Sequence, residues 1–145
     1  MKIAIGSDHA GFELKETIKT FLKEKGIEVK DFGTHSEERV DYPDYAIPLA
    51  ESVANGEEDF GILICGTGIG MSIAANKVKG IRASLCSDVY SAHSAREHNN
   101  ANVLCLGGRV LGKELAKEIV DKWLSSSFLG GRHKRRVDKI MNYEK

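Results

Sequence analysis

The segment GILICGTGIGMS, residues 61–72, places Cys65 between an apolar run and a turn with alternating glycines. At the start of a helix, such a turn leaves the backbone N–H groups of residues 67–70 free to stabilise negative charge. A cysteine beside these donors is expected to have substantial thiolate character. A lone cysteine is more often a small buried apolar residue, but the Gly-Thr-Gly-X-Gly sequence that follows favours a functional thiol.

Three protein classes place a glycine-rich turn after a strand. In this sequence, the turn lacks a residue or motif that each of these classes requires. In a dinucleotide-binding fingerprint, G-x-G-x-x-G, Gly66 and Gly68 would be the first two glycines, but Met71 occupies the position of the third. Asp88 does lie at a suitable distance for the acidic residue of that fingerprint. A phosphate-binding P-loop would need a Gly-Lys-Ser/Thr ending, and the turn has none. A cysteine phosphatase would need arginine where Met71 stands. A nucleotide-binding domain without catalytic activity remains the alternative to an enzyme.

Further groups that could transfer protons come after other periodic segments. Asp8 and His9 follow the apolar run IAI, and a polar pair there is costly unless it caps a helix or has a function. Helix capping accounts for Asp8 but leaves His9 unexplained. His98 and Asn99 come at the predicted C-terminus of a helix, where the helix dipole favours an imidazolium. For Asn99 alone, surface capping is the alternative.

The segment GGRHKRRVDK, residues 130–139, is a basic cluster. Arg132 and Arg136 are four residues apart and would share one face of a helix. Two guanidinium groups on one face can clamp a phosphate, because each binds oxyanions in a planar fork; a solvated basic face is the alternative. Because 21 basic residues balance 21 acidic ones, a small phosphorylated ligand is favoured over a nucleic acid.

These groups together predict acid–base chemistry on a small anionic metabolite. Proton transfer beside a carbonyl needs a base, a stabiliser for the enediolate oxygens and an acid for ring opening. The thiol, the glycine-rich turn and the histidines could supply these three functions. Phosphoryl transfer would instead need magnesium ligands and a lysine-containing loop, which are not evident.

The elements that position these residues alternate between short apolar runs and longer amphipathic segments. Strands are predicted over 2–7, 27–33, 60–65, 81–86 and 101–108, with a helix after each and a last helix over about 132–143. This alternation predicts a single Rossmann-like α/β domain, residues 1–145, with three αβα layers and a five-stranded parallel sheet. Ligands bind at the carboxyl ends of the strands in such sheets, where Asp8, Cys65 and Arg109 are placed.

Composition narrows the class of protein further. The three cysteines, Cys65, Cys86 and Cys105, form no C-x-x-C pair, so neither a zinc site nor a redox dithiol is predicted. Cys86 and Cys105 are expected in the core. No signal-peptide core or membrane-spanning stretch is evident, and free thiols are typical of the reducing cytosol. We therefore expect a cytoplasmic protein that does not act on membranes.

Several motifs, taken in order, resemble one enzyme family along essentially the whole chain. They are GSDHAGFELK, YPDYA, CGTGIGMSIAANKVKGIRA, REHNNANVLCLGGR and RHKRRVDKI. Their combination resembles type B ribose-5-phosphate isomerase, a family that includes galactose-6-phosphate and allose-6-phosphate isomerases. The resemblance implies interconversion of ribose 5-phosphate and ribulose 5-phosphate through an enediolate, without a metal or organic cofactor. The two six-carbon sugar phosphates are the alternative substrates.

The resemblance also implies catalytic roles. Cys65 would be the base that moves a proton between C2 and C1 of the open-chain sugar, and His98 would be the acid that opens the furanose ring. Thr67 would assist the backbone groups that hold the enediolate oxygens. Those backbone groups belong to Gly66, Gly68, Ile69 and Gly70.

Substrate-binding roles follow from the same resemblance. Asp8 would orient the sugar, Asn99 would contact its hydroxyls and Tyr42 would line the pocket. The phosphate would be held by His9, Arg132 and Arg136, with Arg109 nearby. The family's site lies between two subunits, so the resemblance implies a homodimer, able to pair into a tetramer, in which His98 and some arginines come from the neighbour. The last helix would then pack on or near that partner subunit.

Overall fold

The computed structural model describes residues 1–144, and five parallel strands form its centre. They are β1 (Lys2–Ser7), β2 (Glu28–Asp31), β3 (Phe60–Cys65), β4 (Ala83–Leu85) and β5 (Val103–Gly107), in the order β2-β1-β3-β5-β4. The alternation of strands and helices predicted this sheet, and the structure confirms it. β2 and β4 are shorter than predicted and lie at the two edges, where fewer side chains are buried.

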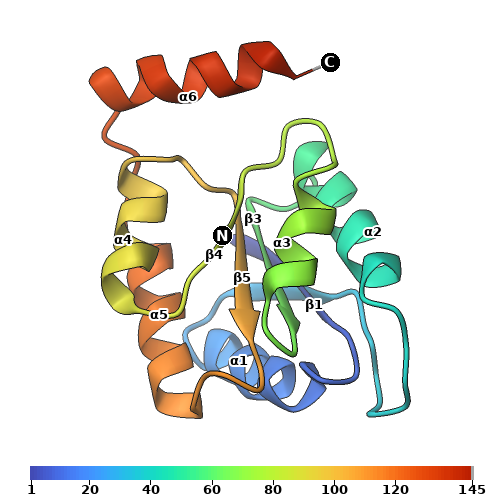
Figure 1. Ribbon diagram of the computed structural model, residues 1–145. Helices are drawn as coiled ribbons and strands as arrows, with labels where there is room; N and C mark the ends of the chain where they lie inside the picture. Colours follow the sequence, from blue (N-terminus) through green and yellow to red (C-terminus); the bar gives the residue numbers. More distant parts are fainter. Residues whose placement is uncertain (145) are drawn as a thin grey trace.

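Six helices accompany the sheet within residues 1–144, and five of them form its two outer layers (Figure 1). One face is covered by α1 (Phe12–Glu24), α4 (Val89–Glu97) and α5 (Lys113–Ser125). The other is covered by α2 (Pro43–Ala54) and α3 (Ile69–Ala75). α6 (Arg132–Tyr143) belongs to neither layer.

β3 is the central strand because its sequence is apolar on both sides. Ile62, Leu63 and Ile64 are all fully buried, and successive side chains of a strand point to opposite faces. Ile62 and Ile64 enter the core under α1 and α5, whereas Leu63 enters the core under α2 and α3. A continuous apolar run is typical of a parallel strand covered by helices on both faces.

α6 lies across the amino ends of the strands, beyond the edge of the two layers. In Figure 1 it crosses above the sheet, and the arrowhead of β5 points away from it. Its C-terminal end is held by Glu144, whose carboxylate accepts a hydrogen bond from the Gly80 N–H at 2.6 Å. The segment before it is held by Leu129, whose N–H donates to the Glu97 carbonyl at 3.1 Å. α6 is therefore fixed at the end of the sheet opposite the carboxyl ends of the strands.

A buried ion pair joins α1 to the end of β2. The ammonium of Lys15, which is fully buried, lies 2.8 and 2.7 Å from the two carboxylate oxygens of Asp31. Lys19 and the Gly33 N–H donate to the same carboxylate, each at 2.8 Å. Burial alone would raise the pKa of Asp31, but these hydrogen bonds outweigh it and lower the pKa from 3.8 to about 2. The carboxylate also orients the backbone that follows β2.

Replacing Asp31 with asparagine should lower the free energy of unfolding by about 3 kcal/mol at pH 7, because Lys15 would keep a buried charge without its counter-ion. Since the folded-state pKa lies below the ordinary value, the contribution of Asp31 is complete above about pH 5 and is lost as the pH falls toward 2. In urea unfolding, the difference in free energy of unfolding between wild type and variant should therefore become smaller as the pH is lowered from 7 to 2.5.

The matched control is Asp121→Asn, which removes the carboxylate of the exposed ion pair with Lys25. That change should lower the free energy of unfolding by less than about 1 kcal/mol. If the difference in free energy of unfolding between wild type and Asp31→Asn did not change with pH, the predicted role of Asp31 would be contradicted.

Candidate functional site

The thiol of Cys65 lies at the carboxyl end of β3 and accepts a backbone hydrogen bond. The Gly68 N–H points at its Sγ at 3.2 Å, and the side chain is 5 % exposed. Gly68 has a positive φ of 81°, and a Cβ there would lie 2.9 Å from the Leu106 carbonyl carbon. Only glycine accommodates both the left-handed backbone and this close approach. The turn therefore directs a backbone N–H donor at the sulfur.

Arg109 is held beside this turn by two backbone hydrogen bonds between the loops after β3 and β5. The Gly108 N–H donates to the Cys65 carbonyl at 2.8 Å, and the Arg109 N–H donates to the Gly66 carbonyl at 3.0 Å. A Cβ on Gly66 would lie 3.6 Å from Nη1 of Arg109, so the guanidinium lies over this glycine. A positive charge is thus placed next to the thiol loop.

Asp8 and His9 lie in the loop after β1, beside the same edge of the sheet. The Asp8 N–H donates to the Ile64 carbonyl at 3.2 Å, and its buried carboxylate accepts from the Gly11 N–H at 3.0 Å. Nδ1 of His9 accepts a hydrogen bond from the Val40 N–H at 3.2 Å. Because Nδ1 accepts this bond, the neutral ring carries its proton on Nε2, which is then available as a donor.

Tyr42 completes this side of the site at the start of α2. A Cβ on Gly70 would lie 2.6 Å from the Tyr42 ring, so the ring packs directly on the first turn of α3. Thr67 uses its hydroxyl locally and accepts a hydrogen bond from the Ile69 N–H at 3.2 Å. A pocket of about 470 Å³ opens beside His9. Its lining residues are His9, Arg39, Val40, Asp41, Asp44 and Tyr45.

We call these residues at the carboxyl ends of the strands the thiol cluster. Its members are Asp8, His9, Tyr42, Cys65, Gly66, Thr67, Gly68, Ile69, Gly70 and Arg109. The sequence predicted that polar residues gather at this edge, and the structure brings them there from four loops.

A second group, the α6 cluster, lies at the amino ends of the strands. Its members are His98, Asn99, Arg132, His133 and Arg136. The His98 ring, at the end of α4, stacks on the His133 ring with 4.3 Å between centroids and 11° between planes. Desolvation and the nearby charges of His98, Arg132 and Arg136 lower the pKa of His133. His133 was not singled out from the sequence, although its place between Arg132 and Arg136 could have indicated it.

The two clusters lie at opposite ends of the sheet within one chain. His98 follows α4, which runs back toward the amino ends, whereas Cys65 ends β3 at the other edge. Glu144 and Leu129 hold both ends of α6 on the side away from Cys65. One chain therefore does not bring the predicted base and the predicted ring-opening acid together.

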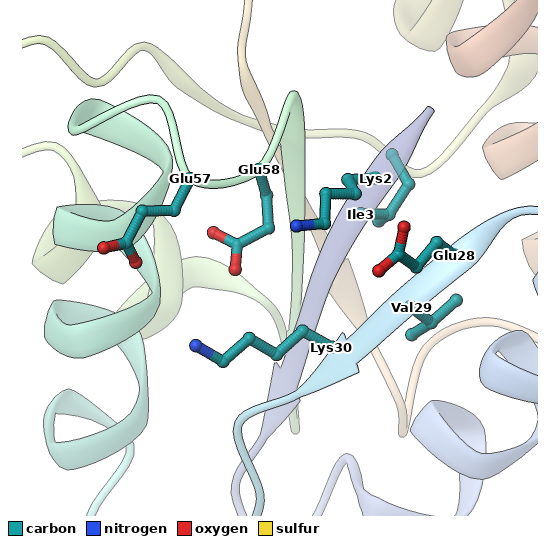
Figure 2. Close-up of a pocket in the computed structure, with 7 residues that line it drawn as sticks. All are labelled: Lys2, Ile3, Glu28, Val29, Lys30, Glu57 and Glu58. Carbon is teal, nitrogen blue, oxygen red and sulfur yellow. The ribbon is translucent and has the colours of Figure 1, made fainter.

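A pocket of about 570 Å³ is not part of either cluster (Figure 2). It lies at the amino ends of β1 and β2 and is lined by Lys2, Ile3, Glu28, Val29, Lys30, Glu57 and Glu58. Figure 2 shows acidic and basic side chains facing one another across it. The Ser52 hydroxyl lies 2.6 Å from a carboxylate oxygen of both Glu57 and Glu58. Two lysines thus face three glutamates, and none of the residues predicted to act in catalysis lines this pocket.

Comparison with known proteins assigns the chain to a family. Residues 3–140 match the Ribose/Galactose Isomerase family model. The chain belongs to the ribose/galactose isomerase family. Its motifs predicted this assignment, and the match extends over nearly all of the sequence.

Named members of this family are similar over their full lengths. Ribose-5-phosphate isomerase B of Escherichia coli is 59% identical over 143 residues, which cover 99% of this chain and 96% of the relative. D-erythrulose-4-phosphate isomerase of Pectobacterium atrosepticum is 51% identical over 145 residues, covering 99% and 95%. Family membership alone therefore does not decide the length of the sugar.

Solved structures of the family have the same fold. Ribose-5-phosphate isomerase B of Clostridium thermocellum superposes with a TM-score of 0.98 at 60% identity, covering 99% of this chain and 97% of that one. The enzyme of Mycoplasma genitalium with bound ribulose-5-phosphate gives a TM-score of 0.95 at 48% identity, covering 99% and 95%. The isomerase fold is thus shared along the whole described chain.

Proposed function

We propose that this chain is an aldose–ketose isomerase that interconverts ribose 5-phosphate and ribulose 5-phosphate. The observation that carries the proposal is the Cys65 thiol at the end of β3 with the Gly68 N–H directed at it. The full-length similarity to enzymes named for this reaction, one of them with bound ribulose-5-phosphate, supports the choice of sugar.

In the proposed reaction, the Cys65 thiolate removes the proton from C2 of the open-chain aldose. The electrons of the broken C–H bond form the C1–C2 double bond, and negative charge passes to the oxygen on C1. Backbone N–H groups of residues 66–70, with Thr67, stabilise this enediolate. The proton of the C2 hydroxyl passes to the oxygen on C1, and the C2–O bond becomes the ketone carbonyl. The electrons of the C1–C2 double bond then take the proton back from the cysteine at C1, which restores the thiolate. No net oxidation or reduction occurs.

The acid that opens the ring is His98 of a second copy of the chain. Because His98 lies at the opposite end of the sheet from Cys65, a complete site needs two chains arranged so that each α6 cluster meets the other chain's thiol cluster. Exposed apolar side chains near both clusters support this homodimer. These are Ile69 and Ile73 on α3, and Leu129 and Ile140 at α6. α6 then packs against the partner, and two such dimers can form a tetramer.

Substrate binding is divided between the two chains in the same way. His9 and Arg109 of one chain and Arg132 and Arg136 of the partner hold the phosphate, because Nε2 of His9 is a free donor and guanidinium groups bind phosphate oxygens in pairs. Asp8 and Tyr42 contact the sugar from the first chain. Asn99 contacts its hydroxyls from the second.

The state of the cysteines supports a cytoplasmic location. All three are unpaired and buried, a state that fits a reducing compartment. No helix among residues 1–144 is long and apolar enough to cross a membrane. We therefore place the enzyme in the cytoplasm.

A substrate panel tests the proposed activity. Purified wild-type chain with a chelator present should convert ribose 5-phosphate to ribulose 5-phosphate with a higher kcat/KM than it shows for allose 6-phosphate, galactose 6-phosphate or D-erythrulose 4-phosphate. A higher kcat/KM for one of the other three would move the assignment within the family. No turnover of any of them, together with tight NAD or AMP binding by calorimetry, would favour the non-catalytic nucleotide-binding alternative.

A further inference from the structure

Arg96, in the last turn of α4, is a buried cation that the proposed reaction does not use. Arg96 is 8 % exposed, and none of its contacts within residues 1–144 is a salt bridge to a carboxylate. Its guanidinium lies over the rings of Phe60 and Trp123, 4.4 and 5.7 Å from their centroids. Burial and the positive charge of Arg82 lower the pKa of Arg96. Keeping a charge there costs free energy that an apolar side chain would not.

The hydrogen bonds of Arg96 go to the turn that follows His98. Nη1 donates to the Ala101 carbonyl at 2.6 Å and to the Asn100 side-chain oxygen at 3.1 Å. A second guanidinium holds the same turn, because Nε of Arg82 donates to the Asn100 carbonyl at 2.7 Å. Asn100 has a φ of 49°, in the left-handed region that residues other than glycine seldom adopt. Two arginines thus fix an uncommon backbone conformation directly after His98 and Asn99.

We propose that Arg96 is a positioning residue for ring opening: it fixes the turn at residues 98–101 so that His98 and Asn99 meet the substrate in a defined orientation. This inference rests on the proposed function, in which His98 is the ring-opening acid. A methionine of similar length would fill the space between Phe60 and Trp123 without a buried charge, but it would leave the Ala101 carbonyl and the Asn100 side chain without their donor. The guanidinium is the group that connects the aromatic core to the turn.

The test separates ring opening from proton transfer by using two reactions. Isomerisation of ribose 5-phosphate requires a furanose ring to open first. Ribulose 5-phosphate has no free hydroxyl on C5 and stays open-chain, so exchange of its C1 proton with deuterium oxide requires Cys65 but not ring opening. For Arg96→Met we expect the kcat of isomerisation to fall about tenfold to a hundredfold. The rate of C1 exchange, followed by proton NMR, should stay within about threefold of wild type.

Two further variants keep the test decisive. Arg96→Lys retains the charge and one donor, and its isomerisation rate should lie between those of wild type and Arg96→Met. Lys122→Met removes one positive charge from an exposed position on the neighbouring α5 and should leave both rates unchanged. Circular dichroism at the assay temperature establishes whether each variant is folded.

Several outcomes would overturn the positioning role. In folded Arg96 variants, these outcomes are an equal fall in the rates of isomerisation and C1 exchange, or no fall in either rate. Unfolding of both Arg96→Met and Arg96→Lys would also overturn it, because that result would assign Arg96 to stability alone. A wild-type chain that exchanges the C1 proton but shows no isomerisation of ribose 5-phosphate would contradict the ring-opening step itself. A wild-type chain inactive in both reactions would contradict the proposed function, and the inference with it.

Discussion

Replacing Cys65 with alanine should lower the kcat for ribose 5-phosphate by about a thousandfold or more, because the variant loses the group that accepts the C2 proton. The loss of stability should be small, because the change to alanine removes only one sulfur atom at the carboxyl end of β3 and keeps the backbone hydrogen bonds of that strand. Circular dichroism and thermal unfolding should therefore resemble those of wild type. C1 exchange of ribulose 5-phosphate should be lost together with isomerisation, in contrast to the Arg96 variants.

Cys86→Ala is the matched control for this change. Cys86 is also buried and comes directly after β4, but it packs in the core under α1 and α5, whereas Cys65 packs in the core under α2 and α3. Burial raises the pKa of its thiol, which keeps it protonated near neutral pH. We expect this variant to retain most of the wild-type kcat. Unchanged turnover in Cys65→Ala would show that another group, such as a carboxylate of the thiol cluster, is the base.

Local sequence patterns were sufficient to predict the fold and the placement of Asp8, Cys65 and Arg109 at one edge of the sheet. The apolar run of β3 specifies a central strand, and the glycines after it specify a turn that only glycine can adopt at Gly68. Cys65 and the donor that contacts it are three residues apart, so their geometry is determined within one turn. Parallel strands then bring Asp8 and Arg109 to the same edge, because every strand ends there.

Contacts between distant segments could not be predicted in this way. The bond from the Val40 N–H to His9 joins residues 31 positions apart, and the bond from Gly80 to Glu144 joins residues 64 positions apart. The second of these bonds places α6 at the amino ends of the strands. Nothing in the period or capping of that helix specifies which end of the sheet it crosses. The physical separation of the two clusters therefore emerges only from the tertiary structure.

Mixing two inactive variants should restore activity if each site takes residues from two chains. One variant is Cys65→Ala, and the other is the double variant Arg132→Gln with Arg136→Gln, which we expect to be inactive because it loses two charged contacts to the phosphate. In a two-fold symmetric dimer that contains one chain of each kind, one site combines the intact Cys65 with the intact arginines, and the other site lacks both. When the two chains are co-expressed in equal amounts and pair at random, about half of the dimers are mixed, and each of these has one complete site out of two. Co-expression should therefore recover about a quarter of the wild-type kcat per site.

The recovered activity depends on which chain supplies the arginines. If α6 served the thiol cluster of its own chain, every site in a mixed dimer would lack either Cys65 or the arginine pair, and co-expression would recover nothing. The structure places α6 at the far end of its own sheet, held there by Glu144 and Leu129. Recovery near a quarter would assign the arginines to the partner's site. Its absence, in dimers shown by differently tagged chains to be mixed, would contradict the shared site.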